Sequence, residues 1–275
     1  MVKYKIVADS SCDLNPELEK IMDVSLVPFK IEIEHQSFID DKDLDINALV
    51  KAMHDSPNPI KTSCPSPGDF VDRYGDGDNV FVVTISEQLS GTFNSAILAK
   101  KMMLEEFPSK FIHVFNSRSA SVGETLVTMK IQEYIEEKLS NSQIVEKVDN
   151  FIDEMKTFFI SEDLSNLVKN GRISKAQGLI ANVLNIKPIM AGSSDGNIVA
   201  LEKVRGSKKA FKRMAEMIGE TGVKFDERIL AISHANALQK ALDLKEDLKK
   251  YNFKDIIIVE TKGLSTAYVN DGGVI

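Results

Sequence analysis

Asn79–Leu104 reads NVFVVTISEQLSGTFNSAILAKKMML, and this stretch decides the fold. The run Val80–Ile85 is apolar and rich in β-branched residues, which predicts a strand buried on both faces. Apolar residues then recur at helical spacing, at Phe93, Ala96, Ile97 and Leu104. The stretch therefore predicts a strand, a small polar turn and a helix.

The turn between this strand and this helix is Ser90-Gly91-Thr92. It lies at the carboxyl end of a strand, where open α/β sheets bind ligands. It also begins a helix, whose free backbone N–H groups favour an anion. We therefore expect the turn to bind a negatively charged group. The alternative is that Ser90 merely caps the helix.

The composition is that of a soluble globular protein able to bury a core. The chain has 275 residues, of which 43% are hydrophobic and 27% charged, and we prefer two medium domains to one large one. The net charge of -7 argues against a protein that mainly binds nucleic acid. The densest basic group, made of Lys208, Lys209, Lys212 and Arg213, is most simply the solvated face of a helix.

The cysteines and histidines do not predict a metal centre. Cys12 and Cys64 form no C-x-x-C pair, and the four histidines show no metal-ligand spacing. We expect no metal and a reducing compartment. The N-terminus has no apolar core of a signal peptide, and no apolar run approaches the roughly 20 residues of a membrane span. The cytoplasm is the expected location, and transient contact with a membrane surface stays open.

Strands and helices alternate along the first part of the chain, which predicts an α/β fold with a mostly parallel sheet. The expected strands are 4–8, 24–33, 80–85 and 111–115. A predicted antiparallel hairpin, 186–191 with 198–204, then departs from this alternation. We therefore expect two domains, 1–160 with the mostly parallel sheet and 161–275 with a mixed sheet. A ligand pocket between them would be a common arrangement.

Two further segments contain candidate binding residues. Ser66 is a plausible N-cap before Pro67, which leaves the hydroxyls of Thr62 and Ser63 in a rigid, proline-rich loop that could serve a ligand. An ordinary turn with solvated hydroxyls is the alternative.

Arg172 follows Gly171, which is placed to end one helix, and precedes a capping-box pattern, Ser174 with Gln177, for a helix over 175–184. This predicts a rigid, exposed mount for a guanidinium. A surface arginine in a weak ion pair is the alternative.

Common catalytic motifs are missing from the sequence. There is no Walker A pattern, no G-x-G-x-x-G after a strand and no G-x-S-x-G. Ser90 could act as a nucleophile only if the fold brought His113 or His234 to it as a base. The residues thus favour a carboxylate- or phosphate-binding site, with a serine-dependent esterase or acyl hydrolase as the alternative.

Taken together, the motifs resemble the DegV family of bacterial fatty-acid-binding proteins. They occur in the family's order over nearly the whole chain, which is far more specific than any one of them. The matching segments are Asp9–Leu14 (DSSCDL), Lys61–Phe70 (KTSCPSPGDF), Leu89–Ala96 (LSGTFNSA), Ser117–Ser121 (SRSAS), Asn170–Lys175 (NGRISK), Asn185–Ile189 (NIKPI) and Lys203–Gly206 (KVRG).

The resemblance implies a long apolar pocket between two α/β domains, holding one long-chain fatty acid with its carboxylate at the mouth. Thr62 and Ser90 match the carboxylate-binding hydroxyls, and the backbone of Gly91 and Thr92 adds support. A buried carboxylate needs such donors. The fatty acid is then the only expected ligand, with no cofactor.

The resemblance also implies a role beside a kinase. A separate ATP-binding kinase would phosphorylate the bound acyl carboxylate, so this chain would be a substrate-carrying subunit and not itself an enzyme. Arg172 matches an arginine that lies outside the carboxylate shell and is suited to the partner or to the transferred phosphate.

The sequence departs from the family pattern at two places. Cys64 stands where many relatives have glutamine, and the closing segment lacks a histidine that many relatives place there. Tyr268 is a candidate substitute donor, and Ser63 is a second auxiliary candidate.

Overall fold

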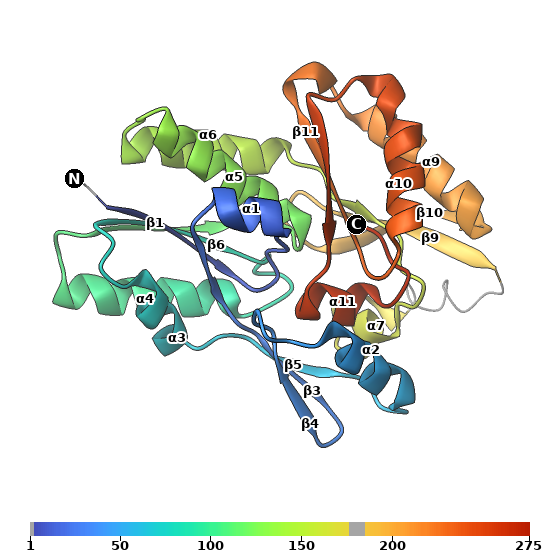
Figure 1. The fold of residues 1–275 in the computed structure, drawn as a ribbon, viewed down its shortest axis with the longest axis horizontal. Helices are drawn as coiled ribbons and strands as arrows, with labels where there is room; N and C mark the ends of the chain where they lie inside the picture. The colour runs from blue at the N-terminus through green and yellow to red at the C-terminus, as the bar shows by residue number, and fades with distance from the viewer. Residues whose placement is uncertain (1–2, 176–184) are drawn as a thin grey trace.

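The central sheet of the computed structural model, which describes residues 3–175 and 185–275, has four parallel strands (Figure 1). Its order is β2-β1-β6-β7, and every neighbouring pair is parallel, with Ile6 opposite Phe81 in the central pair. The strands are β1 (Tyr4–Asp9), β2 (Val24–Val27), β6 (Asn79–Thr84) and β7 (Phe111–Asn116). The predicted parallel sheet is confirmed.

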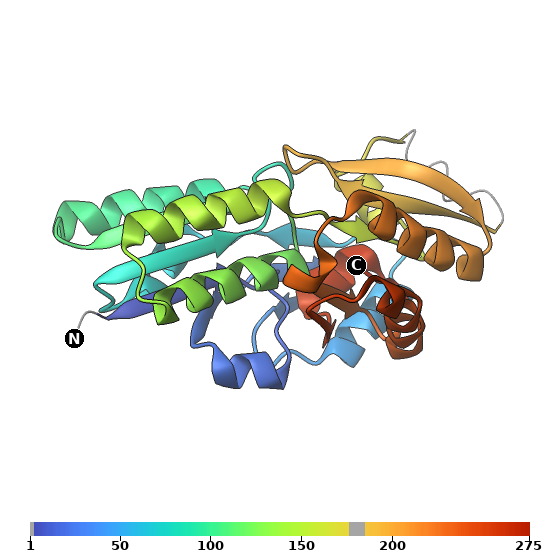
Figure 2. The ribbon, with the colours of Figure 1, turned by 90° about the horizontal axis from the view of Figure 1, so that it is seen from above.

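Helices cover both faces of this sheet (Figures 1 and 2). The helices on one face are α3 (Pro67–Tyr74) and α4 (Thr92–Glu106), and those on the other are α1 (Pro16–Ile21), α5 (Val122–Glu136) and α6 (Asn141–Glu154). Along β6, Val80 and Val82 enter one core cluster, whereas Phe81 and Val83 enter the other. The strand is therefore buried on both faces, as its sequence predicts.

Residues 30–63 form a small antiparallel sheet of their own. It consists of β3 (Lys30–Ile33), β4 (Gln36–Ile39) and β5 (Lys61–Ser63), and α2 (Ile46–Asp55) connects β4 to β5. The prediction of one strand over 24–33 is wrong, because the strand is interrupted at Pro28. Proline has no N–H to donate to a sheet. The N–H of the next residue, Phe29, donates to the Ser10 hydroxyl instead.

Thr62 and Ser63 lie in strand β5, so the prediction that they lie in a loop is also wrong. The segment pairs with β3, where Ile31 stands opposite Thr62. This pairing fixes the backbone of Thr62 more firmly than a loop would.

The C-terminal part has the expected mixture of strand directions. An antiparallel sheet of order β10-β9-β8 contains β8 (Phe158–Phe159), β9 (Ile186–Gly192) and β10 (Ile198–Arg205), whereas β11 (Ile229–His234) and β12 (Asp255–Glu260) are parallel. Single bridges from Val274 to Ile160 and His234 join these two sets. The helices in the described residues of this part are α7 (Ser165–Lys169), α9 (Ser207–Thr221), α10 (Leu238–Leu248) and α11 (Gly263–Val269), with short 3-10 turns at Phe225–Glu227 and Lys249–Tyr251.

Helix α11 packs against the small sheet of residues 30–63 although it is far away in sequence. Ala267 and Tyr268 share a core cluster with Ile31, Leu49 and Ile60. The end of the chain thereby reaches the segment that carries Thr62. The division of the chain near residue 160 stays a prediction.

Polar side chains cap several helices at their N-termini, and the N-cap predicted at Ser66 is confirmed. Asp45, Ser66 and Ser140 are the N-caps of α2, α3 and α6, the last two in capping boxes. On α9, the basic group is confirmed as a solvated face: Lys208, Lys209 and Lys212 are exposed, and Arg213 pairs with glutamates. The helix predicted over 175–184 falls, from residue 176 onward, outside the described residues.

Candidate functional site

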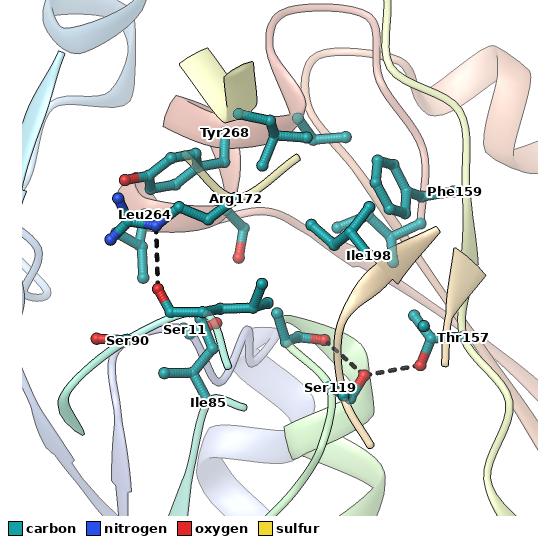
Figure 3. A pocket seen from close by; sticks show the side chains of 18 of the residues that line it. Ser11, Ile85, Ser90, Ser119, Thr157, Phe159, Arg172, Ile198, Leu264 and Tyr268 are labelled. Atoms are coloured by element: carbon teal, nitrogen blue, oxygen red, sulfur yellow. Dashed lines mark hydrogen bonds between the residues drawn. The ribbon is translucent and has the colours of Figure 1, made fainter. Parts of the chain in front are cut away.

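A cavity of about 100 Å³ lies between loops at the carboxyl ends of the parallel strands and elements that follow residue 156 (Figure 3). Its walls are mainly apolar. The apolar residues come from both parts of the chain, and they include Phe29, Ile85, Leu89, Ala120, Phe159, Leu167, Ile198, Leu264 and Val269. Such a cavity suits an apolar ligand and offers it few polar partners.

Polar side chains gather at one end of the cavity, which we call the polar end: Ser90, Arg172 and Tyr268 lie there (Figure 3), and Thr62 joins them through its contact with Tyr268. All four are half-buried. The hydroxyl oxygens of Thr62 and Tyr268 lie 2.8 Å apart, within hydrogen-bond distance. Two residues separated by more than 200 positions in sequence thus meet where an anionic head group could bind.

Ser90 is held by a turn at the end of β6. Its N–H donates to the Ser86 carbonyl over 3.2 Å, and its hydroxyl lies 2.8 Å from the hydroxyl of Thr92. The N-cap of α4 is Gly91, and no side chain caps this helix. The alternative in which Ser90 only caps the helix is therefore wrong, and its hydroxyl stands at the cavity.

Arg172 is not the exposed residue that its sequence context predicts. It is half-buried because its side chain folds back over the cavity, where Nε donates to the Leu89 carbonyl over 3.0 Å (Figure 3). Its guanidinium carbon lies 5.7 Å from the centre of the Tyr268 ring. Gly171 allows this return because it has a positive φ of 74°, which glycine adopts easily. Among the described residues no carboxylate pairs with Arg172, so the weak surface ion pair is not observed there.

The other residues predicted for the site lie next to the cavity wall or farther out. Ser63 and Gly91 are exposed, Thr92 is fully buried, and none of them lines the cavity. Thr92 nevertheless contacts the site through the Ser90 hydroxyl. The polar end therefore brings together Thr62, Ser90, Arg172 and Tyr268 out of the predicted residues.

Neither histidine considered as a base for Ser90 lines the cavity. His113 lies on β7 against the Phe115 ring, and burial lowers its pKa to about 4. The Nδ1 atom of His234 accepts a hydrogen bond from the N–H of Ala237. No described residue thus gives Ser90 the imidazole that a serine nucleophile needs.

Two serines of the cavity wall, Ser11 and Ser119, are not among the residues that the sequence predicts for the site. Both lie in the small, polar loops that follow strands β1 and β7, so their position at the carboxyl end of a parallel strand was the available signal. Ser119 forms a hydrogen bond with Thr157 over 2.7 Å at the end of the cavity opposite the polar end (Figure 3). Thr157 follows a helix and carried no comparable signal.

Residues 3–175 and 185–275 contain neither a metal-ligand cluster nor a membrane-spanning helix. No cluster of three or more histidine, cysteine, aspartate or glutamate side chains in this part of the chain could hold a metal ion. No helix in the same part is both long enough and apolar enough to cross a bilayer.

Comparisons with known proteins agree with this architecture. A DegV-domain-containing protein of Streptococcus gordonii is 36% identical over 276 residues, covering 99% of this chain and 97% of the relative. A DegV-family crystal structure from Ruminococcus gnavus, refined with vaccenic acid, is 40% identical with a TM-score of 0.94, covering 100% of this chain and 99% of the other.

The Fatty Acid Kinase B3 protein of Streptococcus pneumoniae, crystallised with linoleic acid, is 33% identical with a TM-score of 0.92. This similarity covers 99% of this chain and 97% of the other. A sequence model of the DegV family matches residues 3–274. Since that match spans almost the whole length, the chain belongs to the DegV family.

Proposed function

We propose that this protein binds one long-chain fatty acid, with the acyl chain in the apolar cavity and the carboxylate at the polar end. The observation that carries the proposal is an apolar cavity that ends at the hydroxyls of Thr62, Ser90 and Tyr268. The relative refined with vaccenic acid and the relative loaded with linoleic acid support the same ligand class.

The polar end suits a carboxylate because its hydroxyls now bond to other hydroxyls. Thr62 is paired with Tyr268, and Ser90 is paired with Thr92. A hydroxyl can rotate and donate to an incoming carboxylate, which accepts stronger hydrogen bonds than a neutral oxygen does. These donors would offset much of the cost of removing the carboxylate from water. Ser63 and the backbone at Gly91 and Thr92 would then act only as neighbours of these donors.

We further propose that the bound fatty acid is presented to a separate ATP-dependent kinase. A carboxylate oxygen of the ligand would attack the γ-phosphorus of ATP held by the partner. A new P–O bond would form and the bond to ADP would break, which yields an acyl phosphate. This chain would contribute no nucleophile of its own, and we place the reaction in the cytoplasm. The similarity to a fatty acid kinase B3 protein supports this role.

The first test is the identity of the ligand. Native protein should be extracted and its lipid identified by mass spectrometry, and delipidated protein should then be titrated with vaccenic acid. We expect a long-chain fatty acid in the extract and saturable binding of one equivalent. Protein that neither carries nor binds a fatty acid would contradict the proposal.

The second test concerns Arg172, which we assign to the transferred phosphate or to the partner. With a cognate kinase and ATP, Arg172→Ala should still bind vaccenic acid. Its rate of acyl-phosphate formation should fall at least about tenfold, because a lost charge-assisted hydrogen bond costs about 1.5–3 kcal/mol. Arg118→Ala is a matched control, because Arg118 also lines the cavity but pairs with Asp153. Undiminished turnover by Arg172→Ala would contradict the assignment.

A further inference from the structure

Three aspartates, Asp9, Asp13 and Asp40, are buried beside the cavity with exposed fractions of 0, 0 and 2%. We call them the aspartate frame. Among the described residues none of them pairs with a lysine or arginine within ion-pair distance. A buried carboxylate without a cation is costly unless N–H or O–H groups satisfy it. The groups that donate hydrogen bonds to each aspartate therefore show which segment of the chain that aspartate holds in place.

Asp9 holds the segment that leads to Ser90. Its carboxylate accepts from the N–H of Ile85 over 2.8 Å and from the N–H of Ser11 over 3.0 Å. Ile85 and Ser11 both line the cavity. The end of β1 is thereby tied to the residue that follows β6.

Asp13 and Asp40 hold the start of helix α11, more than 220 residues away in sequence. The N–H of Lys262 donates to Asp13 over 2.6 Å. The N–H groups of Gly263 and Leu264 donate to the two oxygens of Asp40 over 2.7 and 2.9 Å. The contact is tight, because a Cβ atom at Gly263 would lie only 2.5 Å from Asp40 Oδ1. The position of α11 is therefore determined by these carboxylates.

Helix α11 carries one wall of the cavity. Leu264, Ser265, Tyr268 and Val269 all line it, and Tyr268 supplies the hydroxyl that meets Thr62. The small sheet that carries Thr62 leads, after β4, directly to Asp40. Asp40 thus connects the segments that carry the two partners of the polar end, Thr62 and Tyr268.

We propose that Asp40 is a positioning residue for the fatty-acid site, which sets the Tyr268 hydroxyl against Thr62 by holding the first turn of α11. The inference rests on the proposed function only for the identity of the ligand. The position of Tyr268 that it assigns to Asp40 does not depend on that function. Asparagine at this position cannot replace the carboxylate, because its NH₂ group would face a donor N–H where an oxygen now accepts.

The test uses fluorotyrosine as a reporter of Tyr268. The chain has five tyrosines and no tryptophan, so 3-fluorotyrosine labelling gives five ¹⁹F signals, of which Tyr268→Phe identifies one. Asp40→Asn should shift the Tyr268 signal and leave that of Tyr74, which is buried against α4 and donates to the Ala96 carbonyl, unchanged. An unshifted Tyr268 signal, or an equal shift of all five, would overturn the proposal.

Binding gives the second measurement. Asp40→Asn should weaken vaccenic acid binding about tenfold, as expected for the loss of a hydrogen bond to a charged acceptor. The control is Asp69→Asn. Asp69 also accepts a hydrogen bond from a backbone N–H, that of Ser66, but it lies in α3 and does not line the cavity. This control should change the affinity for vaccenic acid less than about twofold. Asp40→Asn with the affinity of the parent protein would overturn the proposal.

A second variant keeps the proposal testable if Asp40→Asn does not fold. Gly263→Ala pushes on the same contact from the other side and should shift the same single ¹⁹F signal. Absence of that shift in a folded Gly263→Ala protein would overturn the proposal. If the parent protein bound no fatty acid, the proposed function would fail, whereas the ¹⁹F measurement would still decide the role of Asp40.

Discussion

The polar end of the cavity and the aspartate frame both rest on hydrogen bonds, but the groups that form these bonds differ. At the polar end, half-buried hydroxyls bond to other hydroxyls, as in the pairs Thr62 with Tyr268 and Ser90 with Thr92. In the frame, fully buried carboxylates accept mainly from backbone N–H groups, among them those of Ile85, Lys262 and Gly263.

This difference separates groups that can change partners from groups that cannot. A hydroxyl can rotate from one acceptor to another, so the polar end can accommodate an arriving carboxylate. A backbone N–H has one direction and is costly to leave unsatisfied in the interior, so the frame keeps its partners. Binding and positioning are therefore assigned to different residues, and substitutions should distinguish them.

The largest expected effect is at the polar end. The double substitution Thr62→Val with Ser90→Ala should weaken vaccenic acid binding about 100-fold, because two hydrogen bonds to a carboxylate are lost at about 1.5 kcal/mol each. Methyl vaccenate, which lacks the charge, should bind the parent and the variant with similar affinity. An equal loss for the acid and the ester would show that the substitutions damaged the cavity instead.

The same comparison shows how far the sequence alone could lead. The strand at Val80–Ile85 and the caps at Ser66 and Ser140 were predictable because their signals are local: β-branched runs, an N-cap followed by proline, and a capping box. The Ser90 turn could be located in the same way. Its meeting with Thr62 at one cavity came only from the family resemblance and the fold.

What could not be predicted depends on contacts between distant segments. The prediction that Arg172 is exposed is wrong because its side chain donates a hydrogen bond to the Leu89 carbonyl. The sequence around Arg172 does not reveal this contact. The aspartate frame could not be predicted for a similar reason, because an aspartate next to a polar loop is ordinarily solvated. Asp13 and Asp40 are buried beneath the start of α11, which lies more than 220 residues further along the chain.

The second expected effect is a pH dependence that belongs to the frame. Burial raises the pKa of Asp13 from its ordinary 3.8 to about 7, against the opposing hydrogen bonds from Ser121 and Lys262. Between these values the folded protein binds more protons at Asp13 than the unfolded chain does. This contribution to stability is therefore present at low pH and is lost as the pH rises through about 7.

Asp13→Asn removes this titration, so the variant should gain stability relative to the parent as the pH rises. From about pH 5 to about pH 8 the difference in free energy of unfolding should change by about 2 kcal/mol in favour of the variant. Urea denaturation of both proteins across this range measures it. The difference is read between the two proteins because groups outside the frame, such as His113 and His234, whose pKa values are lowered, titrate equally in both. A difference that is constant with pH would contradict a raised pKa for Asp13.

The smallest expected effect is that of Tyr268. This residue lies on helix α11, which the frame holds, but its hydroxyl belongs to the polar end. Tyr268→Phe removes the hydroxyl and keeps the ring, so the contact with the Arg172 guanidinium remains. Thr62 loses one partner but can still donate to the ligand, so vaccenic acid binding should weaken only about fivefold, as expected for one neutral hydrogen bond. Titration beside the Thr62→Val, Ser90→Ala protein measures this. A loss as large as that of the double variant would mean that Tyr268 itself donates to the carboxylate, whereas no loss would mean that α11 contributes only its apolar wall.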